Sequence, residues 1–270
     1  MFRIAITILL SAAAGFAQTP GAAPKIQALI ITGQNGHDWR GTTPLLRKAL
    51  EDTGRFEVRV TEEYRGGGPE TLAPYDVVIL NYYDSRKPAL RWGDRADQAL
   101  VDYVKSGKGL VVYHFSTAAF DGWTEYETMS AGNWRPNNGH HSAKHDFRVD
   151  VRDADHPITR GLKKSFAQPA DELYANLKWR PEGTFHVLAT AWDDHALYNG
   201  KAKQPTPGAG LDQPMLWTVD YGKGRVFTTA LGHDIPAVGT PAFVGTFVRG
   251  TECAATGAGP IPPPRELRAE

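Results

Sequence analysis

Short apolar segments that alternate with helical patterns constrain the fold of this chain more than any other feature. Amphipathic helices are predicted at Thr43–Thr53, which would begin with a threonine and an N1 proline, and at Asp94–Lys105. Around them lie four segments that are rich in β-branched and aromatic residues and have the length of buried strands: Ile26–Thr32, Phe56–Thr61, Tyr75–Tyr82 and Gly109–Phe115. The alternation predicts an α/β fold, a mostly parallel sheet with helices on both faces.

The second half of the chain has a less regular pattern. Residues 116–146 contain many Gly, Asn, His and Trp residues without a clear period, which predicts a long functional loop or lid. A final helix is predicted from Pro241 to about Thr251. Between them we expect four further strands, at Phe147–Val151, Phe185–Ala191, Met215–Val219 and Arg225–Ala230.

The N-terminal residues have the pattern of a secretory signal. Arg3 is followed by the apolar run Ile4–Ala14 and by small residues that suit cleavage after Ala17. We therefore expect a signal peptide (1–17), a flexible leader (18–25), one α/β domain (26–255) and a loose proline-rich tail (256–270). A protein with this organisation would be periplasmic or secreted; the alternative is an uncleaved buried helix or strand.

Composition excludes several partners. The chain has 270 residues with 30 basic and 30 acidic side chains, so its charge gives no reason to expect nucleic acid or an anionic membrane as a partner. No segment after the N-terminal run is long and apolar enough to predict a membrane span. The single cysteine, Cys253, allows no internal disulfide. The oligomeric state is left open.

Histidines follow several predicted strands at the point where each strand ends. His37 comes after the first strand, His114 ends the fourth, and His233 follows the run Val226–Ala230. Ligands of parallel sheets bind beyond the carboxyl ends of the strands, so these residues predict a site at that edge. Imidazole can bind a metal or move a proton. The alternatives are a turn residue that caps a helix for His37 and a buried core residue for His114.

Two further groups carry possible chemistry. His140, His141 and His145 form a cluster that lacks the H-E-x-x-H pattern, so a solvated polar loop remains an alternative for it. Asp171 and Glu172 are adjacent carboxylates. Glu172 is a candidate general base or metal ligand, and a surface or helix-capping role is the alternative for the pair.

Taken together, four ordered segments resemble the ThuA-like (trehalose utilisation) family. They are TGQNGHDW, GKGLVVYHFS, DADHPITRGL followed by DELY, and GKGRVFTTALGHD, and they cover most of residues 26–254. The resemblance implies the flavodoxin-like fold of class I glutamine amidotransferases, with His37, His114, Glu172 and His233 converging at its edge. His141 occupies a place where related members carry a histidine.

Two departures from related proteins bear on the chemistry. Amidotransferases need a cysteine at the strand-to-helix elbow, where this chain has His114, so glutamine hydrolysis through a thioester is not expected. Some family members carry extra histidines where this chain reads Asn81-Tyr82-Tyr83 and Phe115-Ser116-Thr117. The metal ligands can therefore differ from theirs or be incomplete.

The resemblance implies an activity on sugars, and our hypothesis is a metal-assisted lyase or hydrolase that cleaves a 3-keto-glycoside or a related sugar derivative. A divalent transition metal (zinc or similar) would be held by His37, His114 and His233, while Glu172 and His141 would serve catalysis. The residues expected to contact the substrate are Asp38, Trp39, Tyr82 and Trp123. The alternatives are a non-catalytic carbohydrate-binding protein and an unrelated metal-dependent hydrolase on the same fold.

Overall fold

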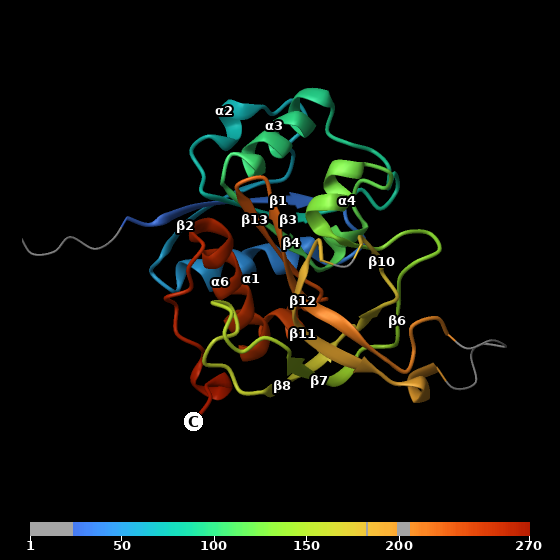
Figure 1. Cartoon of the computed structure of the whole chain (residues 1–270). Helices are drawn as coiled ribbons and strands as arrows, with labels where there is room; N and C mark the ends of the chain where they lie inside the picture. The colour runs from blue at the N-terminus through green and yellow to red at the C-terminus, as the bar shows by residue number, and fades with distance from the viewer. Residues whose placement is uncertain (1–23, 182, 199–205) are drawn as a thin grey trace, which may run out of the picture.

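A computed structural model describes residues 24–181, 183–198 and 206–270, and most of these residues surround one nine-stranded sheet (Figure 1). One half of the sheet is parallel. Its strands, in spatial order, are β2 (Phe56–Thr61), β1 (Ile26–Gly33), β3 (Val77–Tyr82), β4 (Gly109–Tyr113) and β13 (Gly224–Thr229). The order 2-1-3-4 followed by a fifth parallel strand is that of flavodoxin-like folds, so the predicted fold class is confirmed.

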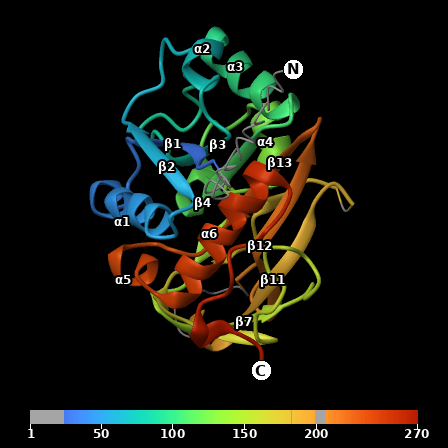
Figure 2. The same cartoon turned by 90° about the vertical axis from the view of Figure 1, so that its left-hand side faces the viewer.

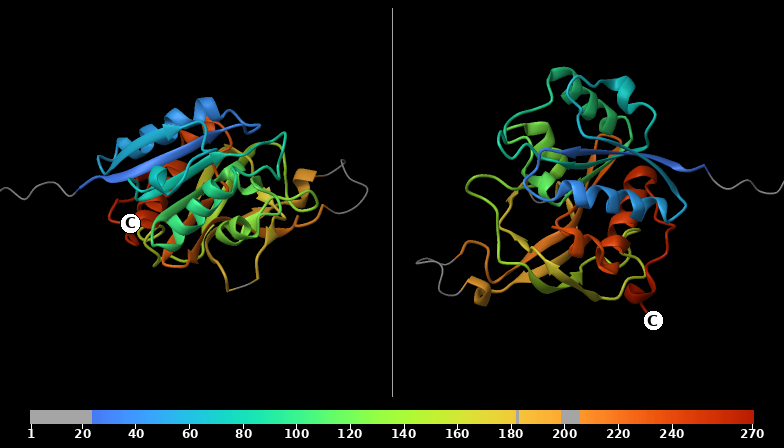
Figure 3. Two further views of the ribbon diagram at one scale, coloured as in Figure 1. Left: turned by 90° about the horizontal axis from the view of Figure 1, so that it is seen from above. Right: turned by 180° about the vertical axis from the view of Figure 1, so that it is seen from behind.

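The other half of the sheet is antiparallel. It continues from β13 through β12 (Leu211–Tyr221), β11 (His186–Asp193), β7 (His145–Val151) and β8 (Ser165–Asp171). Each of these four steps reverses the strand direction, so β8 runs the same way as β13. The end of β8 therefore lies at the same edge of the sheet as the carboxyl ends of the parallel strands. The strands β11 and β12 also extend outward as an arm that ends near the short helix η2 (His195–Tyr198) (Figure 3).

Helices cover both faces of the parallel half (Figures 1 and 2). One face carries α1 (Trp39–Glu51), α5 (Ile235–Val238) and α6 (Pro241–Thr256), and the other carries α2 (Pro69–Leu72), α3 (Asp94–Lys105) and α4 (Thr124–Ser130). Leu46 and Leu50 of α1 are fully buried, and each such leucine stabilises the fold by about 1.5–3 kcal/mol. Gly250 lets α6 approach β13, because a Cβ there would lie 2.1 Å from the Phe227 ring.

Two predicted boundaries differ from the structure. Helix α1 begins at Trp39 rather than Thr43, because the Asp38 side chain accepts a hydrogen bond from the Gly41 amide and caps the first turn. Pro44 therefore lies inside the helix instead of at its start. Strand β8 was not predicted, because its sequence, SFAQPAD, lacks both apolar alternation and β-branched residues.

The prediction of a long functional loop or lid at residues 116–146 is wrong about the loop, because this segment contains short helices and strands. The short helix η1 (His114–Ala118) and α4 are followed by two-residue strands, β5 (Gly132–Asn133) and β6 (His140–His141). These pair with β10 (Lys178–Trp179) and β9 (Tyr174–Ala175). Arg135 is buried in this region and binds the carboxylates of Glu127 and Asp121. Strands of two residues have no detectable period in a sequence, which explains the error.

The C-terminal tail is also better ordered than predicted. It contains the short helix η3 (Arg265–Leu267), and the side chain of Leu267 is buried. The Ala269 amide donates a hydrogen bond to the Gly161 carbonyl, so the end of the chain is attached to the body of the domain. The expected signal peptide (1–17) and all but the last two residues of the expected leader lie outside the described residues. Among the described helices, none combines the length and the apolar character that crossing a bilayer requires.

Candidate metal centre

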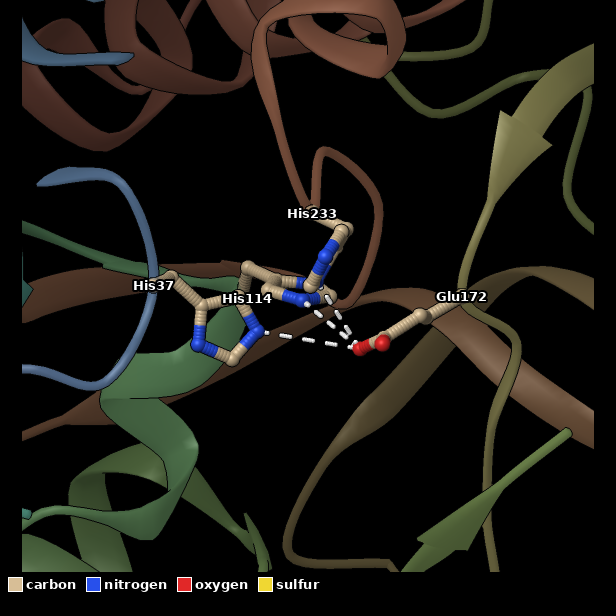
Figure 4. Close-up of side chains that lie close together, drawn as sticks. All are labelled: His37, His114, Glu172 and His233. Atoms are coloured by element: carbon tan, nitrogen blue, oxygen red, sulfur yellow. Dashed lines mark ion pairs between the residues drawn. The ribbon is translucent and has the colours of Figure 1, made fainter. Parts of the chain in front are cut away.

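Four side chains from four separate strand ends meet at one edge of the sheet. His37 follows β1, His114 follows β4, His233 follows β13 and Glu172 follows β8. Each offers one nitrogen or oxygen atom, and these four atoms all lie within 4.8 Å of one another. Figure 4 shows the three imidazole rings gathered on one side of the Glu172 carboxylate, toward which they point. The structure therefore brings together the four residues whose convergence the resemblance implied.

The four atoms lie close together but form no hydrogen bonds of acceptable geometry with the described residues. Oε2 of Glu172 lies 3.0 Å from Nδ1 of His233, 3.7 Å from Nε2 of His37 and 3.8 Å from Nε2 of His114. All four atoms are buried, and none has a hydrogen-bond partner of acceptable geometry among the described residues. Buried polar atoms without partners are rare in native proteins. Three imidazole nitrogens and one carboxylate oxygen suit a transition metal such as zinc, so the residues fit a cation.

The backbone and a hydrogen bond orient His114. The residue stands where β4 turns into η1, with a positive φ of 42°, a conformation that is uncommon for a residue with a side chain. Its Nδ1 lies 2.7 Å from the Ala230 carbonyl oxygen, which can only accept a hydrogen bond. Nδ1 therefore carries the proton, and the lone pair of Nε2 faces Glu172. This is the arrangement by which proteins prepare histidine for metal binding.

A buried polar network holds the turn that carries His37. The Asn35 side-chain oxygen accepts a hydrogen bond from the His37 amide at 2.9 Å, and its side-chain nitrogen donates to Asn81. In η1, Ser116 donates to the Leu80 carbonyl and accepts from the Tyr82 amide. Asn81 and Ser116 belong to the segments Asn81-Tyr82-Tyr83 and Phe115-Ser116-Thr117, where the sequence analysis noted departures from related proteins. In this chain both residues form hydrogen bonds beside the site, and neither is among the four candidate metal ligands.

Burial and charge set the protonation of the cluster. Burial mainly lowers the pKa of His37 to about 4, with the neighbouring Glu172 opposing this shift and the other histidines adding to it. Burial alone would raise the pKa of Glu172, but contacts with His114, His233 and His37 hold it well below its usual range. The carboxylate is thus ionised and His37 is neutral near pH 7. These are the protonation states that bind a metal.

His141 lies on the solvent side of Glu172. Its Nδ1 is 3.4 Å from Oε1 of Glu172 and 2.7 Å from the Ser142 carbonyl oxygen, and its side chain is 39% exposed. The neighbouring His140 lies instead 3.4 Å from the Asp193 carboxylate. The two consecutive histidines of β6 therefore have different partners, and His141 contacts the cluster through Glu172.

The residues predicted to contact a substrate lie elsewhere or have other partners. Asp38 is exposed but caps α1. The ring of Trp39 lies beneath the Arg40 guanidinium and lines a groove of about 360 Å³ between α1 and β2. Tyr82 and Trp123 are only 1% and 4% exposed and pack around Phe120. Neither buried ring is available to a ligand in this conformation.

Three aromatic residues that the sequence reasoning missed lie next to the cluster. Phe115 packs on the His37 ring at 4.1 Å between centroids, and Tyr83 contacts Phe115 at 4.7 Å. On the other side, Trp134 lies 5.8 Å from the His141 ring. All three are partly exposed. Successive residues along a strand point to opposite faces of the sheet. This alternation was the sequence signal that could have identified Tyr83, because Tyr83 directly follows Tyr82.

Comparisons with known proteins agree with this architecture. The model of the ThuA family, described as trehalose utilisation, matches residues 27–254. A ThuA-like protein from Parabacteroides merdae is 29% identical, with a TM-score of 0.78 over 92% of this chain and 96% of that chain. A ThuA-like protein from Bacteroides uniformis is 20% identical, with a TM-score of 0.65 over 91% of this chain and 99% of that chain.

More distant similarity shows the fold alone. A cytoplasmic protein from Salmonella typhimurium is 16% identical, with a TM-score of 0.56 over 84% of this chain and 98% of that chain. No curated protein sequence matches the chain significantly. Because the family model spans nearly the whole α/β domain, this chain belongs to the ThuA (trehalose utilisation) family.

Proposed function

We propose that this protein is an exported, metal-dependent lyase or hydrolase that cleaves a 3-keto-glycoside or a related sugar derivative. The observation that carries the proposal is the convergence of four buried, unpaired ligand atoms at the edge of the sheet. The family description, trehalose utilisation, supports a sugar as the substrate. Export rests on the signal-like residues 1–17.

His37, His114, His233 and Glu172 would hold the metal. A bound divalent ion would act as a Lewis acid that stabilises negative charge developing on a sugar oxygen. The chain contributes orientation: Ala230 fixes the tautomer of His114, and Asn35 fixes the turn of His37. The low pKa of Glu172 keeps its carboxylate charged, so Glu172 is better suited to be a ligand than to take up a proton.

His141 is then the residue best placed to move a proton. Its Nδ1 faces the Ser142 carbonyl and Glu172, both acceptors, so Nδ1 carries a proton and Nε2 is the atom of the neutral ring that can accept one. A ketone at C3 of a sugar makes the C2 proton acidic. His141 would remove that proton, a C1–C2 double bond would form, and the C1–O bond would break. The departing oxygen would take up the proton that His141 removed from C2, which completes the β-elimination and returns His141 to its starting form.

Phe115, Tyr83 and Trp134 are the aromatic rings that we expect to contact the sugar. Each is partly exposed, and each packs against a member of the cluster or against a ring that does. Binding sites for small molecules are commonly lined by aromatic side chains around a few polar groups. Tyr82 and Trp123 are buried, so we expect these three rings, and not those two, to contact the substrate.

The geometry argues against glutamine amidotransferase chemistry. A thioester mechanism needs a cysteine at the strand-to-helix elbow, and His114 stands there. Cys253 lies in α6, where its side chain is buried and burial raises the pKa of its thiol. A buried thiol with a raised pKa is a poor nucleophile.

One observation favours the second candidate, a non-catalytic carbohydrate-binding protein. Four protein ligands would complete a tetrahedral metal shell, and closed shells are typical of structural sites, whereas catalytic zinc keeps a position open. In that case sugars should raise the melting temperature of the protein without being altered.

The test begins with elemental analysis of untagged mature protein, purified without chelators, beside a His114→Ala variant. We expect about one equivalent of a transition metal in the wild type and its loss in the variant. The metal-loaded protein is then assayed on 3-keto-glycosides and on ordinary glycosides. Cleavage of the keto-glycoside supports the lyase; binding without cleavage supports the second candidate, and absence of metal after reconstitution removes the metal-dependent mechanism.

A further inference from the structure

Asp171 is a fully buried carboxylate directly behind the metal-binding cluster. It ends β8, one residue before Glu172, and its exposed fraction is 0%. A charged group is buried at high cost unless other groups compensate it. Its partners therefore indicate what it does.

The partners of Asp171 are all N–H donors, and they belong to both sides of the site. Oδ1 accepts hydrogen bonds from the amides of Glu172 at 2.8 Å and His233 at 2.9 Å. Oδ2 accepts from the Gly232 amide at 2.7 Å and from the Gln168 side chain at 2.9 Å. One carboxylate thus connects the backbone of Glu172 with the turn that carries His233. It joins two strands, β8 and β13, that are not neighbours in the sheet.

Asp171 lies among acidic and histidine side chains. Lys144 is close enough for Asp171 and Glu172 to raise its pKa, but its ion pair is with Asp234. Four N–H donors and no acceptor indicate an ionised carboxylate. Glu172, its neighbour, is ionised as well, and its ion-pair partners among the described residues are all histidines. No lysine or arginine of the described chain forms an ion pair with Asp171. Two adjacent buried carboxylates beside three imidazoles, with no lysine or arginine of the described residues paired with either, suit a divalent cation.

We propose that Asp171 is a positioning residue of the metal centre: it holds Glu172 and His233 at a fixed separation, and it supplies the second negative charge that the bound cation balances. This inference rests on the proposed metal centre, and it assigns to Asp171 a role in metal affinity in addition to its role in the fold. Gln168 supports it from behind, because its side-chain oxygen accepts a hydrogen bond from Thr240 at 3.0 Å, at the start of α6.

The experiment compares Co²⁺ binding by wild-type protein and two variants, read from the ligand-field absorption of the metal. Asp171→Asn replaces one acceptor oxygen by an N–H group and removes the charge. We expect a dissociation constant for Co²⁺ that is about 10- to 100-fold higher and a changed absorption spectrum. Gln168→Ala keeps the carboxylate and removes one of its four donors, so it should weaken Co²⁺ binding in the same direction by less.

Asp193→Asn is the matched control. Asp193 is also a fully buried carboxylate, but it accepts a hydrogen bond from Tyr198 at 2.8 Å and lies near His140, outside the cluster. We expect it to lower stability and to leave the Co²⁺ affinity and spectrum unchanged. Urea unfolding of each protein in chelator measures the purely structural effect separately.

Each outcome distinguishes a role of Asp171 in metal affinity from a purely structural role. Equal affinity and an identical spectrum in Asp171→Asn, or an equal loss in Asp193→Asn, would overturn the inference. If Asp171→Asn does not fold, an unchanged affinity and spectrum in Gln168→Ala would overturn it. If the wild type binds Co²⁺ and the Asp171 variant matches it, only the role of Asp171 is wrong. If the wild type binds no Co²⁺, the metal centre itself is wrong and the inference is lost with it.

Discussion

His233 and Glu172 form the closest contact of the cluster, with 3.0 Å between Nδ1 and Oε2, although the strands that precede them are separated by three others in the sheet. The contact exists because β8 packs against α5 and α6, so that its end meets the turn after β13. The site therefore forms only when the antiparallel half of the sheet folds back onto the parallel half.

Replacing a single cluster histidine should abolish metal binding. His114→Ala removes a proposed ligand whose position the Ala230 carbonyl fixes, and we expect the metal content to fall from about one equivalent to background. His186→Ala is the control, because His186 is exposed and pairs with Asp153 outside the site. Equal metal content in all three proteins would show that the cluster does not hold the metal.

Removing the metal should destabilise the wild-type protein. A ligand that binds only the folded state stabilises it by about 4 kcal/mol at a thousandfold excess over its dissociation constant. We therefore expect chelator to lower the melting temperature of the wild type. Glu172→Gln loses the charged ligand, so its melting temperature should respond little to chelator. A chelator response as large as that of the wild type would rule out Glu172 as a ligand.

The sequence allowed much of this site to be predicted, for a physical reason. His37, His114 and His233 each lie in the turn that follows an apolar strand, and the parallel strands β1, β4 and β13 end at one edge. Glu172 follows a strand that has no β-like pattern, so its place in the cluster came only from the family resemblance. The roles of Tyr82 and Trp123 depended on the direction of each side chain, which tertiary packing decides.

Acid should destabilise the metal-free protein through His37. Burial lowers the pKa of His37 from 6.5 to about 4. In this interval the unfolded chain binds a proton that the folded chain does not, so stability falls as the pH falls from 6.5 toward 4. The lowered pKa of Glu172 adds a loss of the same sign below its ordinary pKa of 4.5.

Urea unfolding in chelator at several pH values measures this dependence. His37→Gln should flatten the slope in the interval, and His186→Gln, an exposed control, should not. Part of the slope should remain, because burial also lowers the pKa of His156. An unchanged slope in His37→Gln would show that His37 is not held neutral by burial.

Loss of an aromatic ring at the site should weaken sugar binding. Phe115→Leu and Trp134→Leu are expected to raise KM for the sugar about 3- to 10-fold, because an aromatic contact contributes about 0.5–1.5 kcal/mol beyond buried area. Trp192→Leu is the control, since Trp192 is 52% exposed on the β11–β12 arm. If the control and the site variants change KM equally, the rings do not bind the substrate.

His141 and His140 allow the proton-transfer step to be tested by comparing adjacent residues. His141 faces Glu172, whereas His140 pairs with Asp193, so the two variants alter the same short strand in different environments. His141→Gln should lower kcat about 10²- to 10⁴-fold, the usual effect of losing a general base, while metal content stays the same. His140→Gln should retain most of the activity.

A fall in metal content in His141→Gln would make His141 a ligand instead of a base. Equal kcat in both variants would show that His141 is not the base and would leave Glu172 as the candidate. The low pKa of the Glu172 carboxylate argues against that role.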